Sequence, residues 1–286
     1  MKSYLRLNNE VLHHYKHTGK LDLAKDKEAA RRYFLEYVNV KLRGFTDVEE
    51  KLRCLVEEGY YENDFLKQYD MPFIEKLYQR AYNCHFRFPS FMSASKFYDG
   101  YAMKSRDGTE ILEKYEDRIV ITALYLARGD KALAERAVDA MMTAYQPATP
   151  TALNSGKRSR GELVSCFKLS MDDSMNSIAA NIGYCLELSR LGGGVGVNLT
   201  DIRPLGDPIK GIHNRASGVM PVAKLLENAF SYSNQLGQRN GSGVVYLNIF
   251  HADIENLISA KKPNADEKIR LATLSTGIIV PSIFFE

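Results

Sequence analysis

The spacing of apolar residues in the first part of the chain is helical. In TDVEEKLRCLVEEGY, Val48, Leu52 and Leu55 fall on one stripe, as expected for a helix that packs on a core along one side. Thr46 and Glu49 have the spacing of a capping box, which predicts that the helix begins at Thr46. The segment MPFIEKLYQRAYNCHF has the same period.

Two more helical periods follow, in EDRIVITALYLARG and DKALAERAVDAMMTAY. Gly129 suits the end of the first helix, because glycine tolerates the left-handed conformation found after many helices. Asp130 suits the cap of the second. Met142 and Tyr145 are predicted to be core residues. This part of the sequence therefore predicts a region of short helices.

After Gln146 the pattern changes to short apolar runs that alternate with helical periods. The runs are ELVSCFKL, GVGVNL, GVVYLNIF and TLSTGIIV, and the helical periods are SMNSIAANIGYCLELSR, SGVMPVAKLLENAFSYSNQ and HADIENLISAKK. Strands that alternate with helices are typical of α/β domains with parallel pairing. The final SIFFE is predicted to be strand-like.

Composition narrows the class of protein. The 286 residues are 45% hydrophobic and 26% charged, which is ordinary for a globular protein with a sizeable core. The formal net charge of +3 gives no reason to expect nucleic-acid binding. The start lacks the apolar segment of a secretory signal, and no run is long enough to cross a membrane. We therefore expect a cytoplasmic protein.

The four cysteines are widely spaced, at Cys54, Cys84, Cys166 and Cys185. This spacing argues against a zinc site and a disulfide framework. Cys54 lies beside a helical stripe and Cys185 falls on one, so both are predicted to be core residues. Cys166 follows Ser165 in an apolar run, where strand alternation places the two side chains on opposite faces. Taken alone, Cys166 fits either a buried packing role or a redox role.

Several loops have the composition of ligand-binding segments. TPTALNSG offers the hydroxyls of Thr149, Thr151 and Ser155, and LGGGVGVNL offers a glycine turn before a strand. DIRPLGDPIKGIHNRASG holds basic residues in a rigid loop that suits a polyphosphate. LGQRNGSGVVYL begins with a polar glycine-rich stretch. Each of these segments also fits an ordinary turn or surface loop.

Eight segments follow one another in order: TPTALNSG, ELVSCF, DDSMNSI, LSRLGGGVGVNL, IRPLGDPIKG, SGVMPVAKLLENAFSYSNQ, GQRNGSGVVYLNIFHADI and KKPNADEKIRLATLS. In this order they resemble the large subunit of ribonucleotide reductase, and most closely its class Ib branch. The resemblance covers nearly the whole chain. It implies a mixed α/β fold, with an N-terminal helical region at residues 1–90 and the first part of a ten-stranded α/β barrel at residues 91–286.

The resemblance also implies an activity, the radical-based reduction of ribonucleoside diphosphates to 2′-deoxyribonucleoside diphosphates. Cys166 matches the first of two cysteines that deliver the reducing equivalents. Thr151 matches a substrate phosphate contact, and Ser165 lies beside the substrate. Gly193 and Gly194 match the loop that faces the ribose.

A second implied site binds an allosteric deoxynucleotide triphosphate or ATP effector with Mg²⁺. The implied effector residues are Asp173, Ser174, Arg203, Lys210, Gln238 and Arg239. Asp173 matches a contact with the effector sugar, and Arg203 and Lys210 match contacts with its phosphates. Residues 237–243 match a loop that relays effector identity to the substrate base.

No cofactor is expected on this chain itself, because in the family a dimetal small subunit supplies the radical. The other implied partners are a thioredoxin- or glutaredoxin-type reductant and a second copy of the chain, which pairs through the helices near 175–190 and 219–235. The family's radical-carrying cysteine and second redox cysteine correspond to positions beyond 286, so the chain alone is expected to be inactive.

Two other interpretations remain open at this point. One is a non-catalytic module that binds a deoxynucleotide triphosphate and dimerises. The other is an unrelated α/β protein that binds phosphate, which the eight ordered segments argue against.

Overall fold

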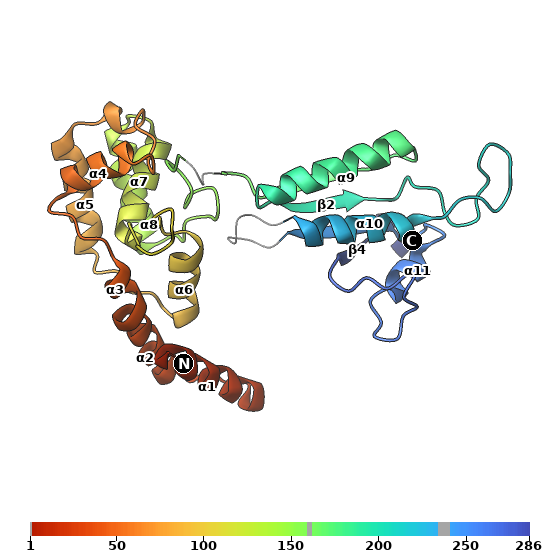
Figure 1. The fold of residues 1–286 in the computed structure, drawn as a ribbon, viewed down its shortest axis with the longest axis horizontal. Coiled ribbons are helices and arrows are strands. Elements are labelled where there is room, and N and C mark those ends of the chain that lie inside the picture. Colours follow the sequence, from red (N-terminus) through yellow and green to blue (C-terminus); the bar gives the residue numbers. More distant parts are fainter. Residues whose placement is uncertain (1, 159–161, 234–240) are drawn as a thin grey trace. The chain divides into compact units, whose positions relative to one another are not determined.

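The computed structural model describes residues 2–158, 162–233 and 241–286 (Figure 1). The chain divides into two compact units, residues 1–163 and 164–286. The first is helical and the second contains a parallel sheet. This division does not fall after residue 90, where the sequence-based boundary lies. Residues 91–163 join the helical unit because their apolar side chains share its core.

The first unit consists of short helices: α1 (Ser3–Thr18), α2 (Leu23–Tyr33), the π-helix η1 (Phe34–Val38), α3 (Asn39–Lys41), α4 (Val48–Glu57), the 3₁₀-helix η2 (Leu66–Gln68), α5 (Met71–Asn83), α6 (Phe91–Gly100), α7 (Tyr115–Ala127) and α8 (Lys131–Thr143). Helix α7 is buried around most of its circumference, and its buried residues include the polar Asp117, Arg118 and Thr122 as well as apolar side chains. It contacts both α5 and α8 and is the centre of this unit.

The N-cap of helix α4 lies one residue later than the sequence pattern predicts. Its N-cap is Asp47, whose carboxylate accepts a 2.7 Å hydrogen bond from the amide of Glu50. The Glu50 carboxylate in turn accepts a 2.7 Å bond from the amide of Thr46. The predicted pairing of Thr46 with Glu49 is therefore wrong, because Asp47 is a stronger N-cap residue than threonine and takes the position.

The ends of α7 and α8 agree with the sequence pattern more closely. The residue directly after α7, in the left-handed conformation, is Arg128 with a φ of 46°, and Gly129 follows it with a φ of 90°. The carboxylate of Asp130 accepts a 2.9 Å bond from Leu133 at the start of α8, as predicted. Met142 lies in the core. Tyr145, also predicted to be a core residue, is 72% exposed, because the helix ends at Thr143 and the chain turns away.

The second unit alternates strands with helices, as predicted: β1 (Cys166–Ser170), α9 (Met175–Arg190), β2 (Gly194–Asn198), α10 (Val219–Tyr232), β3 (Ser242–Asn248), α11 (Ile254–Ser259), β4 (Ser275–Ile279) and the 3₁₀-helix η3 (Ser282–Phe285). The four strands form one parallel sheet in the order β1-β2-β3-β4. The final SIFFE segment is a 3₁₀-helix, so its predicted strand is wrong.

The two faces of this sheet differ in composition. Val195, Val197, Val245 and Leu247 pack against α9, α10 and α11, and they form the core of the unit. The alternate residues lie on the opposite face. In register, they form three rows: Cys166 with Gly194 and Ser242, then Lys168 with Gly196, Val244 and Ser275, then Ser170 with Asn198, Tyr246 and Gly277. This second face has small residues in its first row and mixed residues, including Lys168 and Tyr246, in the other two, and among the described residues no helix of the unit's core packs on it.

In the part of the chain that the structure describes, every helix is too short or too polar to cross a lipid bilayer.

Candidate functional site

The open face of the sheet lines a groove of about 770 Å³. All four strands contribute to it, and Cys166 lies at one end beside Gly194 and Ser242. The residues of this end have short side chains, so a ligand can approach the backbone closely. The groove therefore combines an accessible thiol with space for a small molecule.

Cys166 is the exposed cysteine of the four. It is the first residue of β1, and its Sγ lies 3.8 Å from the Oγ of Ser165. The carbonyl of Ser165 accepts a 2.7 Å hydrogen bond from the amide of Gly194, and this bond joins the residue before β1 to the first residue of β2. This geometry supports a reactive role for Cys166 rather than a packing role.

The other cysteines have different surroundings. Cys185 is fully buried in α9, as predicted, and burial raises the pKa of its thiol to about 12. Cys54 and Cys84 are partly buried in the helical unit. The Sγ of Cys84 donates to the carbonyl of Arg80 at 3.4 Å. Neither lies in the sheet that carries Cys166.

The glycine turn before β2 contains two different kinds of glycine. A Cβ on Gly193 would lie 2.5 Å from the ring of Phe167, so close packing already requires glycine there. A Cβ on Gly194 would meet its nearest neighbour, the Ser242 hydroxyl, at 3.6 Å, which is an ordinary contact. Gly194 is on the open face, whereas Gly193 is fitted against a core aromatic ring.

Thr151 belongs to the helical unit. Its hydroxyl donates to the carbonyl of Leu163 at 2.6 Å, and the buried Ser155 hydroxyl donates to the Thr151 carbonyl at 2.8 Å. Two side chains of α7 hold the same loop: Thr122 donates to the Ala152 carbonyl at 2.8 Å and Arg118 to the Ser155 carbonyl at 2.5 Å. The threonine loop is therefore rigidly fixed to α7.

Three of the predicted effector residues meet at the start of α9. Ser174 is the N-cap of this helix, and its hydroxyl accepts a 3.1 Å bond from Ser177. The neighbouring Asp173 pairs with Arg203, whose guanidinium also donates to the Pro208 carbonyl at 3.0 Å. A helix N-terminus beside a guanidinium favours an anionic group.

For the remaining predicted effector residues the structure gives less detail. Lys210 is exposed in the loop after β2, where it has a φ of 50°. Gln238 and Arg239 lie outside the described residues, as does most of the segment 237–243.

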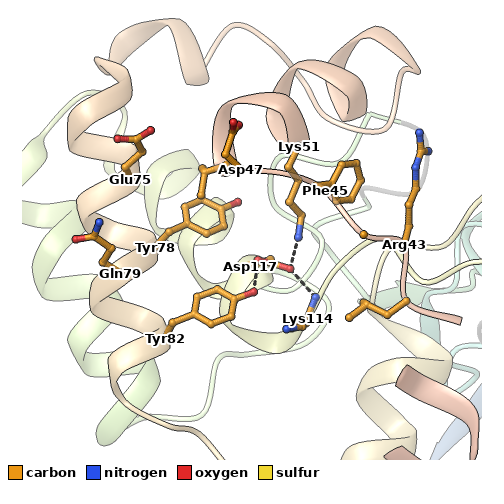
Figure 2. Close-up of a pocket in the computed structure, with 13 residues that line it drawn as sticks. Arg43, Phe45, Asp47, Lys51, Glu75, Tyr78, Gln79, Tyr82, Lys114 and Asp117 are labelled. Atoms are coloured by element: carbon orange, nitrogen blue, oxygen red, sulfur yellow. Dashed lines mark hydrogen bonds and ion pairs between the residues drawn. The ribbon is translucent and has the colours of Figure 1, made fainter. Parts of the chain in front are cut away.

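The helical unit contains a cavity of about 610 Å³ that sequence reasoning missed. Its centre is Asp117, which pairs with Lys51 and accepts a 2.8 Å bond from the Tyr82 hydroxyl and a 2.7 Å bond from the Lys114 amide (Figure 2). The lining comes from segments distant in sequence, so no local motif marks it. Tyr78 also lines this cavity, and its buried hydroxyl has no hydrogen-bond partner within the described ranges.

Comparison with known proteins identifies the family. Residues 4–86 match the model "Ribonucleotide reductase N-terminal", residues 87–160 match "Ribonucleotide reductase, all-alpha domain", and residues 164–286 match "Ribonucleotide reductase, barrel domain". The chain belongs to the ribonucleotide reductase family. The boundary between the last two reductase matches coincides with the division between the two structural units.

Individual reductases are similar over nearly the whole chain. The chain is 50% identical over 285 residues to "Ribonucleoside-diphosphate reductase NrdEB subunit alpha" of Bacillus subtilis (strain 168), covering 99% of this chain and 26% of that protein. It is 49% identical to "Ribonucleoside-diphosphate reductase subunit alpha" of the same strain, with 99% and 40% covered. It is 44% identical to the protein of that name from Mycoplasma pneumoniae, with 92% and 37% covered. The chain thus spans between a quarter and two fifths of these reductase subunits.

Proposed function

We propose that this chain is part of the large subunit of a ribonucleotide reductase that converts ribonucleoside diphosphates to 2′-deoxyribonucleoside diphosphates. The observation that carries the proposal is the position of Cys166. Its thiol is exposed at the first position of β1, on the open face of a parallel sheet and next to the glycine turn. The similarity of nearly the whole chain to reductase alpha subunits supports the same assignment.

In the proposed reaction, Cys166 acts with a second cysteine of the complete subunit. The carbon–oxygen bond at the 2′ position breaks and the hydroxyl leaves as water. The two thiols together supply two electrons and two protons, and their sulfur atoms join in a disulfide. An external dithiol of the thioredoxin or glutaredoxin type then reduces this disulfide. The radical that starts the reaction is supplied by a dimetal small subunit and is not formed on this chain.

The substrate contacts that we propose on this chain are Thr151, Ser165, Cys166, Gly193 and Gly194. Hydroxyl and backbone amide groups of this kind suit a diphosphate and a ribose. Gly193 also has a packing role, because the Phe167 ring occupies the space that a Cβ at this position would need. We further propose a class Ib enzyme, located in the cytoplasm, that works as a homodimer.

The proposed regulatory site binds a deoxynucleotide triphosphate or ATP with Mg²⁺. The residues proposed for it are Asp173, Ser174, Arg203, Lys210, Gln238 and Arg239. The ion pair between Asp173 and Arg203 at the N-terminus of α9 supports this proposal, because it holds a guanidinium where a helix also attracts anions.

Replacing Cys166 with serine in the complete subunit tests the catalytic proposal. Serine keeps the shape of the side chain and cannot form a disulfide, so deoxynucleotide formation with a dithiol reductant should fall by about a thousandfold or more. Cys84→Ser is the matched control, because Cys84 lies in the helical unit and should leave turnover unchanged. Unimpaired turnover of the Cys166→Ser subunit would exclude the redox role.

The second candidate function is a non-catalytic module that binds a deoxynucleotide triphosphate and dimerises. The cluster of Asp173, Ser174 and Arg203 favours it, since these residues come together within a single unit of the chain. Both candidates predict that thymidine triphosphate binds, which calorimetry measures, so the nucleotide-reducing activity of the complete subunit separates them. Binding by a complete subunit that also fails to reduce nucleotides would favour the module.

A further inference from the structure

The turn that follows β3 is attached to the base of the basic loop between β2 and α10. His251, in this turn, has its Nε2 2.7 Å from the carbonyl of Ile202. Its Nδ1 accepts a 3.0 Å bond from the amide of Asp253. Because Nδ1 is an acceptor, the proton of the neutral ring is on Nε2, which therefore donates to Ile202.

Asp253 holds both ends of the same loop. Its carboxylate is 4% exposed and accepts bonds of 3.2 Å from the amide of Leu205 and 3.0 Å from the amide of Val219, the first residue of α10. Gly218, with a φ of 75°, allows this approach, because a Cβ there would lie 2.5 Å from the Asp253 carboxylate. We call His251 and Asp253 the loop clamp.

The chemistry of Asp253 indicates a positioning role. A buried carboxylate is costly unless several donors satisfy it. Within the described ranges, Asp253 forms no ion pair. The groups that donate hydrogen bonds to its carboxylate are the backbone amides of Leu205 and Val219, near the two ends of the loop. An apolar residue here would leave the amides of Leu205 and Val219 without this acceptor, so the bonds to the loop are what this side chain provides.

The loop that the clamp holds carries the positive charges proposed to meet the effector. Arg203 lies between Ile202 and Leu205, which the clamp fixes, and its guanidinium reaches Asp173 and the Pro208 carbonyl. Lys210 is exposed further along the loop. Fixing Ile202 and Leu205 therefore fixes the backbone from which Arg203 projects.

We propose that His251 and Asp253 are positioning residues of the effector site, which hold Arg203 and Lys210 where they meet the phosphates of a nucleoside triphosphate. The proposal rests on the proposed regulatory function. It adds two residues that lie outside the basic loop and that do not themselves contact the ligand.

Asp253→Asn tests the clamp with little change in size. The amide oxygen, placed at Oδ2, can still accept from Val219, but the NH₂ group then stands at the Oδ1 position and opposes the Leu205 donor, so the hold on Leu205 is weakened. Asp201→Asn is the matched control, because it makes the same charge change at an exposed carboxylate at the start of the same loop. In calorimetry of this chain with thymidine triphosphate and Mg²⁺, we expect Asp253→Asn to bind about tenfold more weakly and Asp201→Asn to bind normally.

Limited trypsin digestion supplies a local readout that does not require the ligand. Lys210 and Arg215 are exposed cleavage sites in the clamped loop, and sites in the helical unit are the internal reference. In Asp253→Asn, cleavage after these two residues should accelerate while the reference cleavages keep their rates. His251→Ala should act in the same direction with a smaller effect, because it removes the bonds to the Ile202 carbonyl and the Asp253 amide but keeps the Asp253 carboxylate on the loop. This variant decides the test if Asp253→Asn does not fold.

The possible outcomes are distinct. If the unmodified chain binds no triphosphate, the proposed regulatory site is wrong for this chain, and the digestion alone decides whether the clamp exists. If the unmodified chain binds and both clamp variants bind and digest as it does, the clamp proposal is wrong. Faster cleavage at every site, with a lower melting temperature, would make Asp253 a general stabilising residue and would also overturn the proposal.

Discussion

The same residue type has three different environments in this chain. Cys166 is exposed on the open face of the sheet, Cys185 is enclosed in the core of the second unit, and Cys54 and Cys84 are partly buried among helices. The sequence indicated the burial of Cys185, because its helical stripe is visible in the pattern. It could not decide between the two roles of Cys166, since the exposure of a strand residue depends on whether a second layer covers that face.

Thiol reactivity provides a direct check at the residue scale. On brief treatment of the folded chain with iodoacetamide, Cys166 should be alkylated first and Cys185 last, because burial raises the pKa of Cys185 to about 12 and also blocks access. Mass spectrometry of the digested protein gives the modification at each site. In urea the four rates should converge, and early modification of Cys185 in the folded chain would contradict the structure.

At the scale of elements, the strands and helices of the second unit were predictable and some ends were not. The alternation of apolar runs with helical periods gives the order from β1 to β4 directly. The N-cap of α4 was missed by one residue because the capping-box spacing of Thr46 and Glu49 was given more weight than the stronger N-cap preference of Asp47. The attachment of His251 and Asp253 to the basic loop was invisible, since it joins residues about 50 positions apart.

The contact between β3 and α10 makes a prediction about glycine. A Cβ on Gly243 would lie 2.0 Å from the Phe230 ring, so Gly243→Ala should lower the free energy of unfolding by roughly 1–3 kcal/mol through overpacking. Gly183→Ala is the opposite case, because nothing lies within 4 Å of its Cβ position and it is in the middle of α9. It should be stabilising by up to about 1 kcal/mol. Urea unfolding followed by circular dichroism measures both, and equal effects would contradict this packing.

At the scale of the whole chain, the two units have separate hydrophobic cores. Of the 17 tyrosines, 14 precede residue 164, so tyrosine fluorescence reports mainly on the helical unit. This unit contains a buried ionic group, Glu113, which pairs with Arg118 at 3.1 Å and accepts bonds from the Tyr61 hydroxyl at 2.6 Å and the Met103 amide at 2.8 Å.

Glu113 predicts how the helical unit responds to acid. Burial alone would raise the pKa of this carboxyl, but Arg118 and then Lys157 outweigh it and hold the pKa below its ordinary value of 4.5. Its contribution to stability is therefore complete above pH 4.5 and is lost as the pH falls through the lowered value. Glu113→Gln should destabilise the unit by about 3–5 kcal/mol at pH 7, because Arg118 loses its partner, and should flatten the acid dependence.

Urea titrations between pH 3 and pH 7, followed by tyrosine fluorescence, measure this effect. Glu110→Gln is the control, since Glu110 is an exposed carboxyl in the same segment and should leave both the midpoint and its pH dependence unchanged. An acid dependence of Glu113→Gln identical to that of the unmodified chain would show that another group is responsible.

The Phe167 ring that fills the space beside Gly193 affects how a mutational scan of this protein should be interpreted. A library screened only for yield in the soluble fraction would already lose most variants at Gly193, before any nucleotide is added. Intolerance at that position therefore carries no information about turnover. Gly194, one residue further on, has room for a methyl group, so a loss of activity there can be traced to the groove itself.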